Sequence, residues 1–325
     1  MTRISARLRV AVVCALAALA GAVLIGPPAA ATTTVAVTTA SGLQAAVKAA
    51  KPGTVITLAK GTYTLPLVLA ANGTSTAPIT LVGVGATITT GSASKGYGIH
   101  VTGDYWVIKG VTVTKALKGI VADSAAHLVI DSVTVTSIGQ EGIHFRKSST
   151  DGVVRNSTVK LTGVVDPGYG EGIYVGSAHS NWSSVMGSST TPDRSDRVRI
   201  TGNHISSTPA EGIDIKEGTS RGVVSGNVFY KSGYSGTNYA DSWVDVKGNS
   251  YVLRGNTGSG TKLDAFQTHV EVTGWGRWNR FSTNKVTSGV SGYTVRVAKT
   301  STGTVVACST LATGAAGLTN VGCTR

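Results

Sequence analysis

The sequence has few aromatic residues, few leucines and few acidic residues. Aromatic residues make up 6% of its 325 positions, and 16 aspartates and glutamates stand against 29 lysines and arginines. No basic run is interleaved with aromatic residues and no nucleic-acid-binding motif is present, so nucleic acid is not the expected partner. After the first 31 residues no apolar segment is long enough to span a bilayer, so we expect no membrane partner.

The first 31 residues have the order of a secretory signal peptide. Arg3, Arg7 and Arg9 precede an apolar run over residues 10–25, and small residues follow up to Ala31. Basic, apolar and then small residues are typical of a cleaved leader, and the run is short for a membrane span. We therefore expect a signal peptide over 1–31, one mature domain over 32–325 and a secreted, extracellular protein.

Cysteine is scarce as well. Of the three cysteines, Cys14 lies in the expected leader, which leaves Cys308 and Cys323 near the C-terminus. In an oxidising compartment, a lone pair close in sequence is expected to form one disulfide. This bond would clip the C-terminal end of the domain.

Positive charge is in surplus. The formal net charge is +13, and removal of the three leader arginines leaves about +10. Such a surplus on a secreted protein favours a polyanionic partner. The basic residues are scattered between predicted strands, which suits an extended acidic polysaccharide lying along a long surface.

Glycine, threonine, serine and valine are abundant. Short Val/Ile/Thr-rich segments alternate with glycine-bearing turns, which predicts many short strands and few helices. The exception is SGLQAAVKAA at residues 41–50, where Ser41 can cap a helix with Leu43 and Val47 on one face. We expect this helix to cover the open end of a stack, because terminal units of solenoids need caps.

Internal repeats indicate what is stacked. Seven similar segments recur with a period of roughly 20 to 30 residues, apart from a longer spacing between Glu171 and Glu211 that contains an insertion, and each is followed by a second β-rich segment. Signals for antiparallel hairpins are weak. The sequence therefore predicts an all-β, single-stranded right-handed parallel β-helix with a short N-terminal capping helix. The seven segments begin at Tyr97, Lys118, Glu141, Glu171, Glu211, Ser242 and Asp264.

A column of turn-forming residues supports this alignment. Asn, Asp and Gly tolerate the left-handed backbone of a tight corner, and stacked Asn side chains can bond from coil to coil. The column resembles the asparagine ladder of parallel β-helix proteins, and we interpret it as structural. Its members are Gly110, Asp131, Asn156, Asn203, Asn227, Asn256 and Asn284.

Stacking would also gather charged residues. Adjacent parallel strands lie ~4.8 Å apart and alternate residues point outward, so each alignment column becomes a row of neighbours. Acidic and then basic residues line one face of the middle coils. One column is Glu141, Glu171, Glu211, Ser242 and Asp264; the next is His144, Tyr174, Asp214, Asp245 and Gln267; the third is Arg146, Gly176, Lys216, Lys247 and His269.

Stacked carboxylates need a compensating charge, because like charges directly opposite one another destabilise a sheet. A hard cation such as Ca²⁺ is one solution, since it prefers several oxygen ligands. Flanking Lys216 and Lys247 are the other, and the sequence leaves both open. The insertion AHSNWSSVMGSSTTPDRSDR, which contains His179 and Trp182, is expected to form a loop beside the groove.

The coil pattern, the leader and the segment EGIDIKEGTS together resemble right-handed β-helix polysaccharide lyases, in particular the alginate lyase and chondroitinase B group. That group places a calcium-ligating Glu five residues before a catalytic Lys, and Glu211 and Lys216 have this spacing. The resemblance implies Glu211 as a metal ligand and Lys216 as the base. That group has a catalytic Arg about one coil further on; here Lys247 lies in the equivalent column, and Arg254 lies later on the same coil. Pro209 replaces the second Glu of the group. Pectate lyases match equally well at the level of the class.

The leading hypothesis is a secreted, monomeric lyase that cleaves a uronate-containing polysaccharide by β-elimination. A lysine among cations or partly desolvated can have its pKa lowered enough to act as a base. The expected catalytic residues are Lys216, Lys247 and Arg254; the expected Ca²⁺ ligands are Glu171, Glu211, Asp214 and Asp245; the expected substrate contacts are Arg146, Tyr174, Trp182 and His269.

Two other functions fit the same fold. A glycoside hydrolase similar to polygalacturonases would use clustered carboxylates as acid and base. A non-catalytic carbohydrate-binding solenoid would use the charged columns only as scaffold. The candidate carboxylates for hydrolysis are Asp214, Asp241, Asp245 and Asp264.

Overall fold

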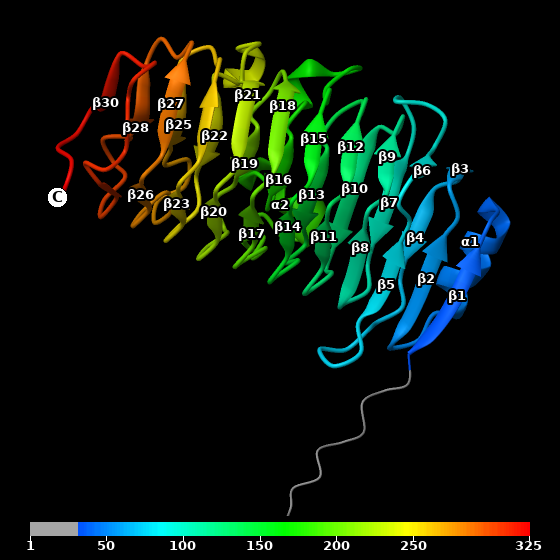
Figure 1. Ribbon diagram of the computed structural model, residues 1–325. Coiled ribbons are helices and arrows are strands. Elements are labelled where there is room, and N and C mark those ends of the chain that lie inside the picture. The colour runs from blue at the N-terminus through cyan, green and yellow to red at the C-terminus, as the bar shows by residue number, and fades with distance from the viewer. Residues whose placement is uncertain (1–31) are drawn as a thin grey trace, which may run out of the picture.

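The computed structural model describes residues 32–325, which wind into a right-handed parallel β-helix of about 11 turns (Figure 1). The signal peptide predicted over 1–31 lies outside the described residues. Three parallel sheets, here called A, B and C, run the length of the stack with 11, 9 and 10 strands. The predicted fold is confirmed. Within the described residues, no helix is long and apolar enough to cross a membrane.

Each coil contributes one short strand to each sheet. Sheet A contains β1 (Thr33–Val37), β2 (Thr54–Leu58), β5 (Ile79–Val82), β8 (Trp106–Lys109), β11 (Val129–Asp131), β14 (Val153–Arg155), β17 (Arg199–Thr201), β20 (Val223–Ser225), β23 (Val252–Arg254), β26 (Arg280–Ser282) and β29 (Val305–Val306). Sheet B contains β3 (Gly61–Thr64), β6 (Ala86–Thr89), β9 (Thr112–Thr114), β12 (Thr134–Thr136), β15 (Thr158–Lys160), β18 (His204–Thr208), β21 (Val228–Ser232), β24 (Thr257–Ser259) and β27 (Lys285–Ser288). Sheet C contains β4 (Leu67–Leu69), β7 (Tyr97–Val101), β10 (Lys118–Asp123), β13 (Ile143–Arg146), β16 (Ile173–Val175), β19 (Ile213–Ile215), β22 (Ser242–Val246), β25 (Asp264–Thr268), β28 (Tyr293–Arg296) and β30 (Gly317–Thr319).

Helices are few and short. The predicted capping helix is α1 (Ala40–Ala49), which covers the first coils and buries Leu43 and Val47. Its cap is Thr39, whose side chain accepts the N–H of Gly42 at 3.0 Å, and not Ser41 as the sequence suggested. The others are α2 (Trp182–Met186) and the 3₁₀ turns η1 (Pro167–Tyr169), η2 (His179–Asn181) and η3 (Thr237–Tyr239).

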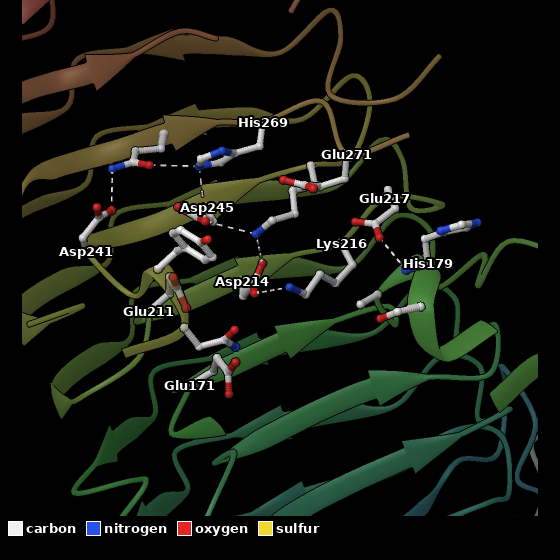
Figure 2. Close-up of a pocket in the computed structure, with 16 residues that line it drawn as sticks. Glu171, His179, Glu211, Asp214, Lys216, Glu217, Asp241, Asp245, His269 and Glu271 are labelled. Atoms are coloured by element: carbon white, nitrogen blue, oxygen red, sulfur yellow. Dashed lines mark hydrogen bonds and ion pairs between the residues drawn. The ribbon is translucent and has the colours of Figure 1, made fainter. Parts of the chain in front are cut away.

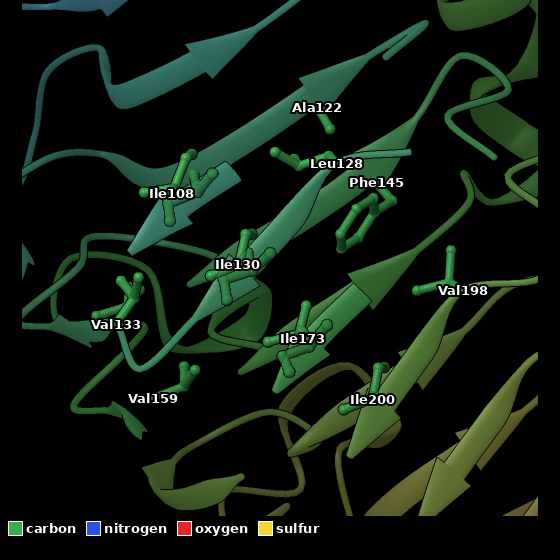
Figure 3. Close-up of a cluster of buried hydrophobic side chains, with 14 of the residues drawn as sticks. Ile108, Ala122, Leu128, Ile130, Val133, Phe145, Val159, Ile173, Val198 and Ile200 are labelled. Atoms are coloured by element: carbon green, nitrogen blue, oxygen red, sulfur yellow. The ribbon is translucent and has the colours of Figure 1, made fainter. Parts of the chain in front are cut away.

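The core is a stack of aliphatic side chains inside the coils (Figure 3). In sheet A, Ile108 pairs with Ile130, and Val154 pairs with both Ile130 and Ile200, so each methyl group rests on its equivalent in the next coil. All four side chains are at most 1% exposed. Because every coil repeats the same contacts, the apolar columns fix the register of the whole stack.

The asparagine ladder is real but begins later than predicted. Asn203, Asn227, Asn256 and Asn284 are buried in one column. Each Oδ1 accepts both the backbone and the side-chain N–H of the preceding asparagine, at 2.9–3.1 Å. One coil earlier, Ser157 occupies the ladder position, and its backbone N–H donates to Asn203 Oδ1.

The predicted members Gly110 and Asn156 belong to the neighbouring corner column, and Asp131 lies one residue before it. The corner column has a left-handed backbone, with φ of 71° at Gly110, 52° at Asn156 and 65° at Gly202. The sequence alignment was wrong by one or two residues in these coils, because glycine and asparagine fit either of two adjacent corner positions.

The C-terminal end is closed by the predicted disulfide. Cys308 and Cys323 are bonded, with a Cα–Cα distance of 5.1 Å across a separation of 15 residues. A loop of this size corresponds to about 3 kcal/mol of stabilisation in the chain-entropy model.

Removal of one ladder side chain should destabilise the stack strongly. Asn227→Ala leaves the Asn203 N–H groups and the Ile200 carbonyl without their partner in a buried column, and it removes one of the two donors to Asn256 Oδ1. We expect a loss of about 2–4 kcal/mol in the free energy of unfolding, measured by urea denaturation. Ser225→Ala, on the outward side of the same coil, should change it by less than about 0.5 kcal/mol. Equal stabilities for the two variants would contradict a ladder held by these bonds.

Candidate active site

The charged columns predicted from the sequence lie on sheet C. Ile143, Ile173, Ile213, Val244 and Phe266 are in register and buried inside the coils. The next residues pair outward in the order His144, Tyr174, Asp214, Asp245 and Gln267. The predicted register is thus confirmed for the middle coils.

A pocket of about 650 Å³ opens over β16, β19, β22 and β25 (Figure 2). The insertion after β16 supplies one wall, with His179 and Ser180. The loop before β22 supplies the other, with Asn238 and Tyr239. The pocket brings together seven residues predicted from the sequence: Glu171, Glu211, Asp214, Asp245, Lys216, Lys247 and His269.

Two lysines and two aspartates form the centre of the pocket. Lys247 Nζ lies 2.9 Å from Asp214 Oδ1 and 3.0 Å from Asp245 Oδ2, and Lys216 Nζ lies 2.7 Å from Asp214 Oδ2. Burial alone would lower the pKa of each lysine, but the Asp214 carboxylate outweighs burial and holds both pKa values above the ordinary range. Both lysines are therefore ammonium ions in this arrangement.

The two aspartates respond in the opposite sense. Burial would raise the pKa of Asp214 and of Asp245, yet Lys247, with Lys216 on Asp214 and His269 on Asp245, lowers both. Asp245 is further fixed by the Ser242 hydroxyl, which donates to its Oδ1 at 2.6 Å. Both aspartates are ionised, and their charges are compensated by side chains of this chain.

Glu171 and Glu211 differ from the aspartates. Neither has an ion-pair partner within residues 32–325, and Glu171 Oε2 is a buried oxygen without a hydrogen bond. Burial, with the charges of Glu141 and Asp214, raises the pKa of Glu171 to about 8. Burial and the charges of Asp245 and Asp214 raise the pKa of Glu211 as well. Oxygens of Glu171, Glu211 and Asp214 lie within 4.8 Å of one another, so this buried triad could hold a metal ion.

His269 lies at the C-terminal side of the pocket. Its Nε2 is 2.9 Å from Gln267 Oε1 and 3.4 Å from Asp245 Oδ2. Burial would lower the pKa of His269, but Asp245 outweighs it and raises the pKa. The Gln267 amide also donates to Asp241 at 2.7 Å and to Asp264 at 3.0 Å, which ties the two outer aspartates to the same network.

Tyr174 supports a lysine from below. It is 9% exposed, and Lys216 Nζ lies 5.1 Å from the centre of its ring. Its ring and that of His144 form a T-shaped pair, with a centroid distance of 4.4 Å. The ring therefore has little surface for a sugar, and its contact is with the lysine that lies above it.

Three predicted site residues lie elsewhere. Arg254 is exposed on β23 of sheet A, on a different side of the coil. Trp182 is 3% exposed and donates its ring N–H to the Ser177 carbonyl at 2.9 Å, so it anchors the insertion from inside. Arg146 is on sheet C outside the pocket, where it binds Asp123 through two nitrogens. The prediction for Arg254 was wrong because a corner of the coil separates it from the sheet that carries the pocket. The prediction for Trp182 was wrong because the sequence of a loop does not indicate which of its side chains is buried.

Sequence reasoning missed four residues that line the pocket: Glu217, Asn238, Tyr239 and Glu271. All of them lie in the segments between strands and outside the three aligned columns, where the coils differ in length and give no repeat to align. Glu217 was detectable in principle, because it directly follows Lys216. Its carboxylate accepts the backbone N–H of His179 and so holds the insertion against the pocket.

Comparison with known proteins agrees with this architecture. The family model described as right-handed β-helix region matches residues 97–322, and a second, described as Pel9A-like right-handed β-helix region, matches residues 27–163. No curated protein sequence matches the chain.

Solved structures give a closer relationship. An alginate lyase from Paenibacillus sp. str. FPU-7 is 40% identical, with a TM-score of 0.83, and the match covers 90% of this chain and 100% of that one. The pectate lyase Pel9A is 18% identical, with a TM-score of 0.64, over 84% of this chain and 77% of that one. A GH136 lacto-N-biosidase from Eubacterium ramulus, at 10% identity and a TM-score of 0.59 over 88% and 66%, shares the fold alone. The chain therefore belongs to the right-handed parallel β-helix family of polysaccharide lyases.

Proposed function

We propose that this chain is a secreted lyase that cleaves a uronate-containing polysaccharide by β-elimination. The observation that carries the proposal is the pair of buried ammonium groups, Lys216 and Lys247, on the floor of an acidic pocket. The 40% identity to an alginate lyase over its whole length supports the same reaction class. The net charge of +13 and the expected leader are consistent with an acidic polymer outside the cell.

β-Elimination makes three demands on the site. The substrate carboxylate must be neutralised, a base must take the proton from the adjacent carbon, and the oxygen of the breaking C–O bond must receive a proton. Lys247 and His269 lie together and offer N–H donors to the carboxylate. Lys216 takes the proton, and the ammonium that results can supply it to the leaving oxygen as the new C=C bond forms.

Lys216 needs help to act as a base. With Asp214 at 2.7 Å its pKa is raised, so the amine form is scarce. Withdrawal of the negative charge of Asp214 would lower the pKa of Lys216 and release the amine. Asp214 is shared between the lysines and the acidic triad, so this carboxylate controls the protonation of Lys216.

The triad has the donor set of a calcium site. Ca²⁺ takes carboxylate, amide and water oxygens, and Glu171 offers a buried oxygen without a partner. A bound divalent cation would supply the positive charge that keeps all three carboxylates ionised. It would also offset the negative charge of Asp214 and so lower the pKa of Lys216. We propose Glu171, Glu211 and Asp214 as ligands. Asp245, predicted as a fourth ligand, is not retained because it does not belong to the group of carboxylates whose oxygens lie within 4.8 Å of one another.

Hydrolysis by the four aspartates predicted for it, Asp214, Asp241, Asp245 and Asp264, is less well supported. A hydrolase needs one carboxyl group held protonated as a general acid and a second held ionised. Lys247 bridges Asp214 and Asp245 and lowers the pKa of both. Asp241 and Asp264 have raised pKa values, chiefly through burial, but the Gln267 amide engages both of them.

The products should distinguish the candidate functions. Incubation of the secreted protein with alginate, pectate, glucuronan and chondroitin should yield an unsaturated uronate with at least one polymer, detected by ultraviolet absorbance. New reducing ends without that absorbance would establish hydrolysis. Retention on an acidic-polymer column without either signal would establish a binding protein.

Lys216→Met should lower kcat/KM by about 10²–10⁴-fold, because it removes the base while it keeps the length of the side chain. Arg254→Ala is the control and should retain wild-type activity, since Arg254 is exposed on another sheet. Initial rates of product absorbance measure both. A fully active Lys216→Met variant would remove Lys216 from the mechanism.

Calcium should raise the melting temperature, and more so at higher pH. Glu171 has a pKa of about 8, above its unfolded value, so its proton is retained at pH 5–6 and competes with the metal. Without metal, ionisation of Glu171 should destabilise the fold as pH rises from about 5 to 8, and Ca²⁺ should reverse the loss. Thermal unfolding with and without EDTA measures this.

Glu211→Gln should abolish the calcium effect on the melting temperature. Glu141→Gln should preserve it, because Glu141 lies in the same column but is paired with Lys118 outside the triad. A calcium effect that survives in both variants would place the ion elsewhere.

A further inference from the structure

Tyr239 has the most exposed large apolar side chain of the described residues. It lies at the end of η3, in the loop before β22, and is 87% exposed. It lines the pocket beside Asn238 and Asp241, on the wall opposite His179. An aromatic ring in this position has no protein partner to cover its faces, although it stands at the entrance to a substrate pocket.

The backbone holds this ring out at a cost. Asn238 and Tyr239 are consecutive residues in the left-handed region, with φ of 55° and 64°. This conformation is unfavourable for a bulky residue and persists only where neighbouring contacts impose it. Tyr239 is thus placed by the loop and not by burial of its side chain.

Contacts on both sides of the ring residue fix the loop. The Gly236 N–H donates to the Ala240 carbonyl at 2.8 Å, which closes the turn. Asn238 Nδ2 donates to the Gly168 carbonyl of η1 at 3.4 Å, and η1 packs against η3. Gly168 allows this approach, because a Cβ there would lie 3.2 Å from the Thr237 methyl group.

The chemistry of the two sides of the pocket is complementary to a uronate sugar. A pyranose ring has an apolar C–H face, which packs on an aromatic face, and a uronate has a carboxylate at its edge. Lys247 provides a cationic N–H group and His269 an imidazole ring in the pocket, and Tyr239 provides an uncovered aromatic face at the rim.

We propose that Tyr239 is a substrate-positioning residue, whose ring stacks on a uronate sugar adjacent to the one that reacts. This proposal rests on the proposed lyase function. The ring holds the polymer between the two walls and contributes to binding, while the lysines and the acidic triad perform the chemistry. Its contribution therefore appears in KM and not in kcat.

Tyr239→Asn tests the ring with little disturbance to the loop, because Asn tolerates the left-handed backbone. We expect KM for the polymer to rise about three- to tenfold with kcat within about twofold, the size of one aromatic contact. Tyr239→Phe keeps the ring and should restore the wild-type KM. Tyr234→Ala is the matched control, because Tyr234 is 49% exposed on the same loop but lines a separate cavity of about 590 Å³.

The outcomes separate this proposal from the proposed function. An unchanged KM in Tyr239→Asn overturns it, as does a Tyr239→Phe variant that is as impaired as Tyr239→Asn. If the wild-type protein forms no unsaturated product, the lyase function fails, and affinity electrophoresis in alginate or pectate gels replaces the kinetic assay. Weaker retardation of Tyr239→Asn alone then supports the stacking contact, and equal retardation of all four proteins overturns it.

Discussion

The structure depends on one geometric constraint: each coil sits about one strand spacing, ~4.8 Å, from the next, in unbroken register. For apolar side chains this constraint is favourable, because Ile108, Ile130, Val154 and Ile200 rest on one another without a gap. For charged side chains it is costly, because equivalent residues face each other at strand spacing. The electrostatics of the pocket follow from the ways in which sheet C meets that cost.

One column shows two of these ways in adjacent coils. Glu141 is paired with Lys118 and His144, which outweigh burial and bring its pKa down to about 2. Glu171, one coil further on, has no such partner, and burial raises its pKa to about 8. The same residue type in the same column is therefore ionised in one coil and protonated at neutral pH in the next. Glu171, like Glu211 in the next coil, is thus a carboxyl group without a counter-charge among residues 32–325.

Much of this arrangement could be predicted from the sequence because strand residues obey a period of two and the coils repeat. That rule, continued one or two residues past the strand ends, predicts Glu211, Asp214, Lys216, Lys247 and His269 on one face. It gave no information for the longer segments between strands, where the coils differ in length. Arg254 was assigned across a corner, Trp182 was expected on a loop surface but is buried, and Tyr239 was missed because its place depends on contacts between η1 and η3. The alignment of the asparagine ladder was wrong at Gly110, Asp131 and Asn156 for a related reason, because two adjacent corner positions accept similar residues.

The asparagine ladder gives the molecule a nearly one-dimensional energetics. Each interior coil is bonded to its two neighbours, so its stability depends mainly on the contacts with the coil before it and the coil after it. Such a stack loses order most readily by fraying at its ends, where α1 and the Cys308–Cys323 disulfide are located. The coils of β16 to β25, which carry the pocket, are interior to the stack. Partial melting at either end would therefore spare the reactive groups until the damage had spread inward.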